Sequence, residues 1–273
     1  MTAASRIALD LRALRARAYV RIVGSIREPA WVVSDAVLPA FAMAAFVLLY
    51  RALGAPRSYE TVAVIGGILS TYWLNVLWGM GAQLYWEKQQ GQLALYFAAP
   101  CSRMSILAGM ALGSILIVTV RSVIGIVIGF LVLRVPIGAF DPGALALVFV
   151  VTMAALYSLG MLFSSLFLLY GREAWHLCNA MVEPVYFLSG MYFPLRTLGA
   201  LGAVAAGIIP LGLGTDAMRQ VLIGEAARGL LPVRTEVALL AGLAVVLFVS
   251  ARGALAYIER LSKHEGRLTQ RWQ

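Results

Sequence analysis

Side chains that could act as nucleophiles, metal ligands or redox groups are few in this sequence and lie far apart. The only cysteines are Cys101 and Cys178, and the only histidines are His176 and His264. Neither pair has the short spacing of a zinc site or of a redox-active CxxC motif. We therefore expect two structural thiols and two interfacial imidazoles, with no bound metal.

Phosphate chemistry of the P-loop type needs a glycine-rich loop followed by lysine, because backbone N–H groups cradle the phosphate and the lysine neutralises it. Lys88 follows glutamate and Lys263 follows serine, so no such loop exists here. The HExxH and GxSxG motifs are also missing from the sequence. Asp35, Asp141 and Asp216 fall at or beyond the ends of apolar segments, which argues against the paired aspartates of an intramembrane protease. The sequence predicts a chain that is not an enzyme and binds no cofactor itself.

Two charged residues lie inside otherwise apolar segments, namely Arg121 and Glu183. An arginine in the middle of a membrane span costs at least about 2.5–3.5 kcal/mol on insertion scales, so it needs a partner or water. Glu183 is the candidate partner that we expect, and the two residues would form a polar lining or an interspan pair. The alternative is that Arg121 extends its long side chain to the membrane surface.

The composition of the chain explains why such residues would be in a membrane. Of its 273 residues, 61% are hydrophobic and 13% are charged, and the mean hydropathy is +0.85. A soluble domain carries about 25% charged residues to cover its surface. An all-α membrane protein is therefore expected. The basic excess, 22 Lys and Arg against 13 Asp and Glu, indicates orientation and lipid contact rather than nucleic-acid binding.

Apolar segments long enough to form membrane helices occur six times, since a span needs about 20 residues. They are predicted at 31–50, 61–86, 105–133, 144–170, 174–190 and 236–257. Together, residues 31–257 would form one transmembrane domain. The segment 197–215 is also uncharged, but five glycines and Pro210 make it a poor lipid-exposed helix. We predict a re-entrant or external hairpin at about 191–230, between spans five and six.

Positive charge orients the six-span arrangement. Lys and Arg are concentrated before residue 31, in the first loop and in the basic tail 258–273, which places both termini in the cytoplasm. Within residues 1–30, apolar side chains recur every three or four positions, and Arg6, Arg12 and Arg17 lie off that stripe. This pattern predicts an amphipathic helix on the membrane surface. The near-absence of lysine favours a GC-rich bacterium and hence its inner membrane.

Two stretches resemble the permease subunits of type-2 ABC exporters. The first is WEKQQGQLALYFAAPCSRMSILAG at residues 86–109, and the second is EPVYFLSGMYFPLRTLG at residues 183–199, followed by IIPLGLGTDAMRQVL at residues 208–222. The positions that match the family pattern are Glu87, Gly91, Leu93 and Pro100 in the first, and Ser189, Gly190, Pro194, Pro210 and Arg219 in the others. Glu183 departs from the pattern, because an apolar residue is ordinary at that place.

The resemblance implies a division of labour. A separate ABC ATPase, in two copies, would hold ATP and Mg, and a second permease, identical or homologous, would complete a dimer. Helix-forming residues of the first cytoplasmic loop would couple the permease to the ATPase. The implied contacts there are the apolar Leu93, Leu95, Tyr96 and Phe97 and the polar Glu87 and Lys88.

The resemblance thus implies an exporter of an amphipathic drug, lipid, glycolipid or polysaccharide. Two alternatives remain open. A secondary transporter driven by an ion gradient would need inverted repeats and several buried acids at mid-membrane, of which only Glu183 is a candidate. A membrane scaffold that transports nothing would not need Arg121 and Glu183.

Overall fold

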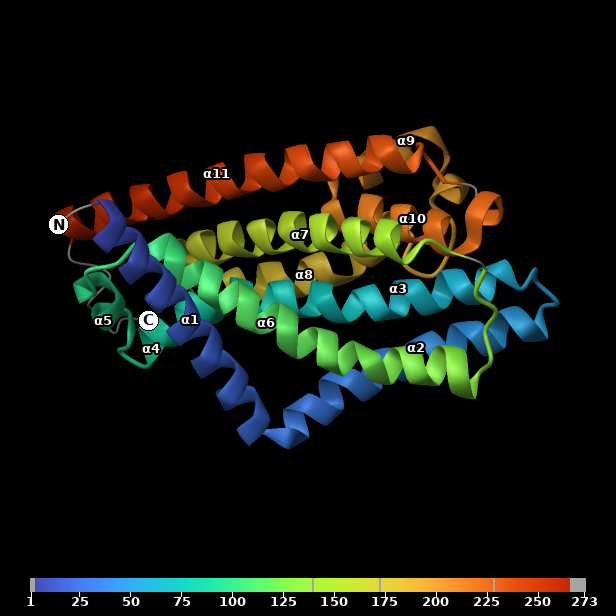
Figure 1. Cartoon of the computed structure of the whole chain (residues 1–273), viewed down its shortest axis with the longest axis horizontal. Helices are drawn as coiled ribbons and strands as arrows, with labels where there is room; N and C mark the ends of the chain where they lie inside the picture. Colours follow the sequence, from blue (N-terminus) through green and yellow to red (C-terminus); the bar gives the residue numbers. More distant parts are fainter. Residues whose placement is uncertain (1–2, 139, 172, 228, 266–273) are drawn as a thin grey trace.

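The structure is a computed structural model that describes residues 3–138, 140–171, 173–227 and 229–265. Every regular element in these ranges is helical, as the composition predicts (Figure 1). In chain order they are α1 (Ala3–Arg27), α2 (Pro29–Ala52), α3 (Ser58–Leu74), η1 (Asn75–Gly81), α4 (Gln83–Gln89), α5 (Leu93–Ala98), α6 (Arg103–Ile126), η2 (Val127–Val132), α7 (Pro142–Tyr170), α8 (Glu173–Leu188), η3 (Leu195–Leu198), α9 (Gly199–Ile208), α10 (Pro210–Ile223), η4 (Gly224–Ala227) and α11 (Val233–Glu265). The elements η1 and η2 are π-helical, and η3 and η4 are 3₁₀-helical.

Five helical segments of the described chain are long and apolar enough to cross a bilayer. They are Val33–Ala52, Ser58–Gln89, Arg103–Val132, Pro142–Leu168 and Val233–Arg260, and they coincide with five of the predicted spans. The sixth, predicted at 174–190, corresponds to α8, whose 16 residues are fewer than the about 20 that a span needs. The all-α membrane fold is confirmed, and the six crossings and the cytoplasmic termini stay predictions.

The long helices pack as a bundle with small helices at both ends. Helix α11 lies along α7, and α7 packs in turn on η1 and α10, while α2 packs on α3 (Figure 1). Helices α4 and α5 lie at one end of the bundle, which we call the coupling end, and α9 and α10 lie at the other. Helix α1 crosses α6 obliquely on the side of the coupling end. The predicted N-terminal helix is therefore present, whereas its place in the lipid headgroups stays a prediction.

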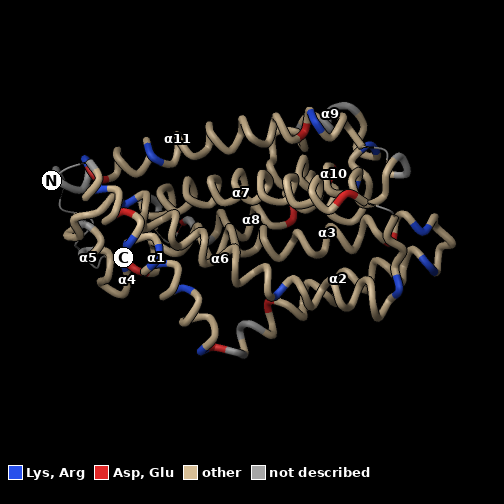
Figure 2. Tube along the Cα trace, in the orientation of Figure 1, with Lys and Arg blue, Asp and Glu red and all other residues tan. Residues whose placement is uncertain are grey.

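The segment Ser58–Gln89, made of α3, η1 and α4, is the most buried of the long helical segments, and we call it the central helix. In the apolar stretch of Ser58–Gln89, 67% of residues are buried, against 11% in Val233–Arg260. The central helix supplies the large core side chains Tyr72 and Trp73, whereas α11 exposes residues such as Val245 and Val249. Charged residues gather mainly at the two ends of the bundle (Figure 2). Such exposed apolar faces suit lipid or a partner protein rather than water.

The predicted hairpin at 191–230 forms short helices instead of one span. Helix α9 ends at Ile208 and α10 begins at Pro210, because proline lacks an N–H to continue the preceding helix. Residues 210–219 of α10 are buried, and the helix packs on α3, α7 and α11. Protein therefore covers α10, whereas Ile208 at the end of α9 is 69% exposed.

Candidate functional site

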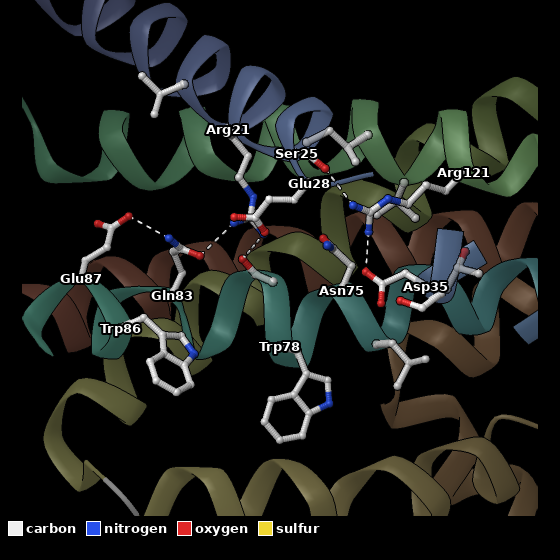
Figure 3. Close-up of a pocket in the computed structure, with 18 of the residues that line it drawn as sticks. Arg21, Ser25, Glu28, Asp35, Asn75, Trp78, Gln83, Trp86, Glu87 and Arg121 are labelled. Atoms are coloured by element: carbon white, nitrogen blue, oxygen red, sulfur yellow. Dashed lines mark hydrogen bonds and ion pairs between the residues drawn. The ribbon is translucent and has the colours of Figure 1, made fainter. Parts of the chain in front are cut away.

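A cleft of about 860 Å³ opens between α1, the start of α2, the central helix and α6. Many of its lining residues are polar or charged, and two tryptophans of the central helix contribute apolar surface (Figure 3). The lining includes Arg17, Arg21, Ser25, Glu28, Asp35, Asn75, Trp78, Gln83, Trp86, Glu87 and Arg121. The cleft thus joins charge to aromatic surface beside the coupling end.

Two glycines of α6 allow α1 to form one wall of this cleft. Gly109 and Gly113 are one helical turn apart and face α1. A Cβ atom at Gly113 would lie 2.9 Å from the carbonyl oxygen of Ala18, and one at Gly109 would lie 2.9 Å from the Cβ atom of Arg17. Small residues four positions apart permit close backbone contact between membrane helices. This contact holds Arg17 and Arg21 against the central helix.

Arg21 is the centre of the polar contacts in the cleft. Its guanidinium donates to Ser114 Oγ at 3.2 Å, to Gln83 Oε1 at 2.9 Å and to the Gly79 carbonyl at 2.8 Å. Gly79 belongs to the π-helix η1, a kind of element that often occurs at functional sites. Arg21 thereby connects α1 with α6 and with two segments of the central helix.

The contacts continue from Arg21 to the coupling end. Gln83 donates from Nε2 to Glu87 Oε1 at 2.8 Å, and Glu87 forms an ion pair with Arg17. The Arg17 guanidinium lies over the ring of Tyr96, with its central carbon 5.1 Å from the ring centre. Tyr96 is in α5, so this set of contacts, which we call the polar chain, runs from α5 to α6. Figure 3 shows its middle part, from Glu87 through Gln83 to Arg21.

The two arginines of α1 carry their charge in a desolvated place. Burial lowers the pKa of both Arg17 and Arg21. The neighbouring Arg17 cation lowers the pKa of Arg21 further. Arginine remains protonated at neutral pH even so, because its ordinary pKa exceeds 12. Arg17 is balanced by Glu87, whereas the hydrogen-bond acceptors of Arg21 are all uncharged.

Arg121 forms its ion pair with Asp35 rather than with the expected Glu183. The Arg121 guanidinium donates to Asp35 Oδ2 at 2.6 Å and to Ser25 Oγ at 2.7 Å (Figure 3). Glu183 is solvent- or lipid-exposed on α8 and is not part of the cleft. The expected pair is therefore wrong. Arg121 instead joins α6 to α1 and α2, which meet at the break before Pro29.

The first loop forms two helices separated by a tight turn. Gly91 has a φ of +76°, and it terminates α4 with hydrogen bonds from Gly91 N to Lys88 O and from Gln92 N to Glu87 O. This pair of bonds is the Schellman motif, in which glycine adopts the left-handed conformation at no steric cost. The turn sets the direction of α5 relative to α4.

Two residues of this loop that were expected to contact an ATPase are buried within the chain itself, and the coupling role of the loop stays a prediction. Glu87 is 2% exposed and pairs with Arg17, and Leu93 is 4% exposed and packs in the apolar core. Lys88 and Tyr96 are half-buried, while Leu95 is 69% exposed and Pro100 is exposed. The side chain of Phe97 lies outside the described residues. Among the described residues of α5, Leu95 is thus a large apolar side chain that points outward.

The motif residues at the opposite end do lie together. Ser189 is fully buried, and Gly190 has a φ of +57°. A Cβ atom at Gly190 would lie 2.8 Å from the Phe193 carbonyl oxygen, so only glycine fits. Pro194 precedes η3, and Pro210 is the first residue of α10.

Arg219 fastens this loop. It is 1% exposed and donates to the carbonyls of Met191 at 2.7 Å, Val62 at 2.9 Å and Phe193 at 3.3 Å. The Tyr50 hydroxyl donates to the Tyr192 carbonyl at 2.6 Å. Helices α2, α3 and α10 therefore hold residues 191–193 from three sides.

Sequence reasoning missed the polar contacts of Arg21, Gln83 and Asp35. The signal that could have found them is the pair Gly109 and Gly113, which predicts a helix packed on α6. No group of three or more His, Cys, Asp or Glu side chains that could hold a metal occurs within the described ranges. The cleft presents polar and apolar surface together, and the polar chain connects α5 with α1, α6 and the central helix.

The chain was compared with known proteins. A family model described as ABC-2 type transporter matches residues 14–223. The match includes most of α1, the cleft, the first loop and α10. No curated protein sequence matches the chain.

Proposed function

The chain belongs to the ABC-2 type transporter family, and from this premise we propose that it is the membrane permease of an ATP-driven exporter. The cargo would be an amphipathic drug, lipid, glycolipid or polysaccharide, moved out of the cytoplasm of a bacterium across its inner membrane. A separate ATPase subunit, in two copies, would bind ATP and Mg. This chain would supply the pathway and bind neither.

One observation carries the proposal: the polar chain connects the loop helix α5 to the cleft between α1, α2, the central helix and α6. A soluble motor can move membrane helices only through an element that is packed against them, since packed interfaces transmit strain. Tyr96, Arg17 and Glu87 provide that packing. Displacement of α5 would move α1 and α4 together, and both helices line the cleft.

The lining of the cleft supports the proposed class of cargo. Arg21 and Arg121 offer guanidinium groups for polar headgroups, and Trp78 and Trp86 offer flat apolar surface. Trp86 is 42% exposed, so a ligand can contact it. An amphipathic molecule needs both kinds of surface in one site.

A second permease is part of the proposal because the apolar faces of several helices are exposed in the single chain. The helices α2, α6 and α11 expose many large apolar side chains, among them Phe41, Val120 and Val245. Lipid covers some of this area, and a second identical or homologous permease would cover the rest to close the pathway.

Reconstitution tests the proposal. The purified chain should hydrolyse no ATP, because it lacks a phosphate-binding loop. When it is coexpressed with a candidate ABC ATPase, the complex should copurify, and fluorescent lipid or drug should move across vesicles only with ATP and Mg. ATP hydrolysis by the chain alone, or ATP-independent transport driven by an ion gradient, would overturn the assignment.

A further inference from the structure

Two acidic side chains are buried together where α10 meets the first turn of α11. Asp216 in α10 is 2% exposed, and Glu236 in α11 is 0% exposed. Both carboxyl groups reach the same side-chain amide, that of Gln220. Carboxylates only accept hydrogen bonds, so two carboxyl groups around one amide can bond to each other only if one of them carries a proton.

Among the described residues, few donors reach the two carboxyl groups. The Gln220 amide nitrogen lies 3.0 Å from Glu236 Oε2, 3.4 Å from Asp216 Oδ2 and 2.8 Å from the Leu231 carbonyl, and it has only two hydrogens to share. Leu230 N donates to Asp216 Oδ2 at 2.6 Å. Oε1 of Glu236 is buried and has no hydrogen-bond partner among the described protein groups.

Among the described residues, few other charged groups lie near the two carboxyl groups. The Arg219 guanidinium, on the same helix, interacts electrostatically with Asp216. Helices α7 and α9, which pack on α10, contain no Asp, Glu, Lys, Arg or His. On α3, Glu60 is paired with Arg51 at 2.7 Å, and on α11 the Arg234 side chain is exposed. The side chain of Glu225 in η4 lies outside the described residues.

We propose that Asp216 and Glu236 together bind one proton, which clamps α10 to α11 at the end of the bundle opposite α5. Two like charges in this buried place would repel each other, and the single proton removes one of them. The bound proton also supplies the missing donor. The site is a proton-binding site that holds the hairpin, and with it Arg219, against the last long helix.

Infrared spectroscopy of the purified full-length chain tests the site directly. At neutral pH the wild-type protein should show the carbonyl stretch of a protonated carboxylic acid, and Glu236→Gln should remove it. Glu60→Gln is the matched control, because Glu60 is equally buried but ion-paired with Arg51, and it should leave the band unchanged. A wild-type spectrum without this band would overturn the proposal, whether or not the variants fold.

Thermal unfolding provides the second readout. The folded protein would hold a proton that the unfolded chain releases at neutral pH, so stability must fall as pH rises. Between about pH 6 and about pH 9, the wild-type melting temperature should fall by about 2–4 °C or more beyond the fall in Glu236→Gln. The glutamine amide donates to Asp216 at every pH, so the variant should lose this component. Identical pH profiles of the wild type and the variant would count against the proton clamp.

Discussion

The Arg17 guanidinium forms an ion pair with the carboxylate of Glu87, although the two residues belong to the N-terminal helix and to the end of the central helix. Their side chains are 14% and 2% exposed, so the pair is largely removed from water. A buried charge that loses its partner is costly, whereas an exposed pair contributes little. A movement that separates α1 from α4 must therefore break this ion pair, whereas a movement of the two helices together can preserve it.

Neutralising Glu87 should uncouple the permease. We expect Glu87→Gln to lower the free energy of unfolding by about 3 kcal/mol, because Arg17 is left buried without its anion. Transport and stimulation of the ATPase should fall together. The control is Arg15→Ala, an exposed arginine on the same helix. Equal melting temperatures and equal transport for the two variants would exclude a role for the pair.

Leu93 and Leu95 should respond in opposite ways to truncation. Leu93→Ala should destabilise the chain by about 2–5 kcal/mol, the usual loss for a buried leucine. Leu95→Ala should leave the melting temperature within the range of surface substitutions but weaken copurification of the ATPase, because Leu95 is exposed on α5. Undiminished ATPase binding by Leu95→Ala would show that the motor docks elsewhere.

The turn at Gly91 should tolerate no side chain. A left-handed backbone costs a residue with a Cβ atom about 1–2 kcal/mol, so Gly91→Ala should disturb the direction of α5 and reduce transport. Gly242→Ala is the matched control, since that glycine is helical and has open space around it. Wild-type transport by Gly91→Ala would mean that the turn is only a connector.

Cysteine labelling tests the proposed orientation. In a background without Cys101 and Cys178, a cysteine at Arg57 should react with an impermeant maleimide on whole cells. Cysteines at Gln90 and Arg260 should react only after permeabilisation, since the Lys and Arg bias places both in the cytoplasm. These three side chains are exposed, so access to the reagent depends on the membrane side alone. External labelling at Arg260 would require an odd number of crossings.

Hydropathy predicts the long helices because it is a local property of the chain. The segments 61–86, 105–133 and 144–170 each coincide with a helical segment of the structure to within a few residues. Helix α1 was predictable too, from the spacing of its apolar side chains. Hydropathy could not decide whether α8 crosses the bilayer, because its length is borderline and it contains both Glu183 and Pro184.

Side-chain partners were harder to predict, because they depend on contacts between distant segments. Arg121 pairs with Asp35 of a helix far earlier in the chain, whereas the sequence offered Glu183, the other charged residue within a predicted span. The sequence also could not show which side of the six-residue helix α5 faces the core, because a helix this short gives little periodicity. Leu93 and Leu95 are both leucine, and only the direction set by the Gly91 turn separates them.

The contacts of α1 also fix an order of events during synthesis. Helix α1 is made before the groups that hold Arg17 and Arg21, which are Gln83, Glu87 and Ser114. Its close backbone contacts with Gly109 and Gly113 likewise require the third long helix. The nascent helix must therefore wait without its partners, at the membrane surface or bound to a chaperone, until residues beyond 114 have been inserted. Docking of α1 on α6 is therefore a late step in biogenesis, although α1 precedes α6 in the chain.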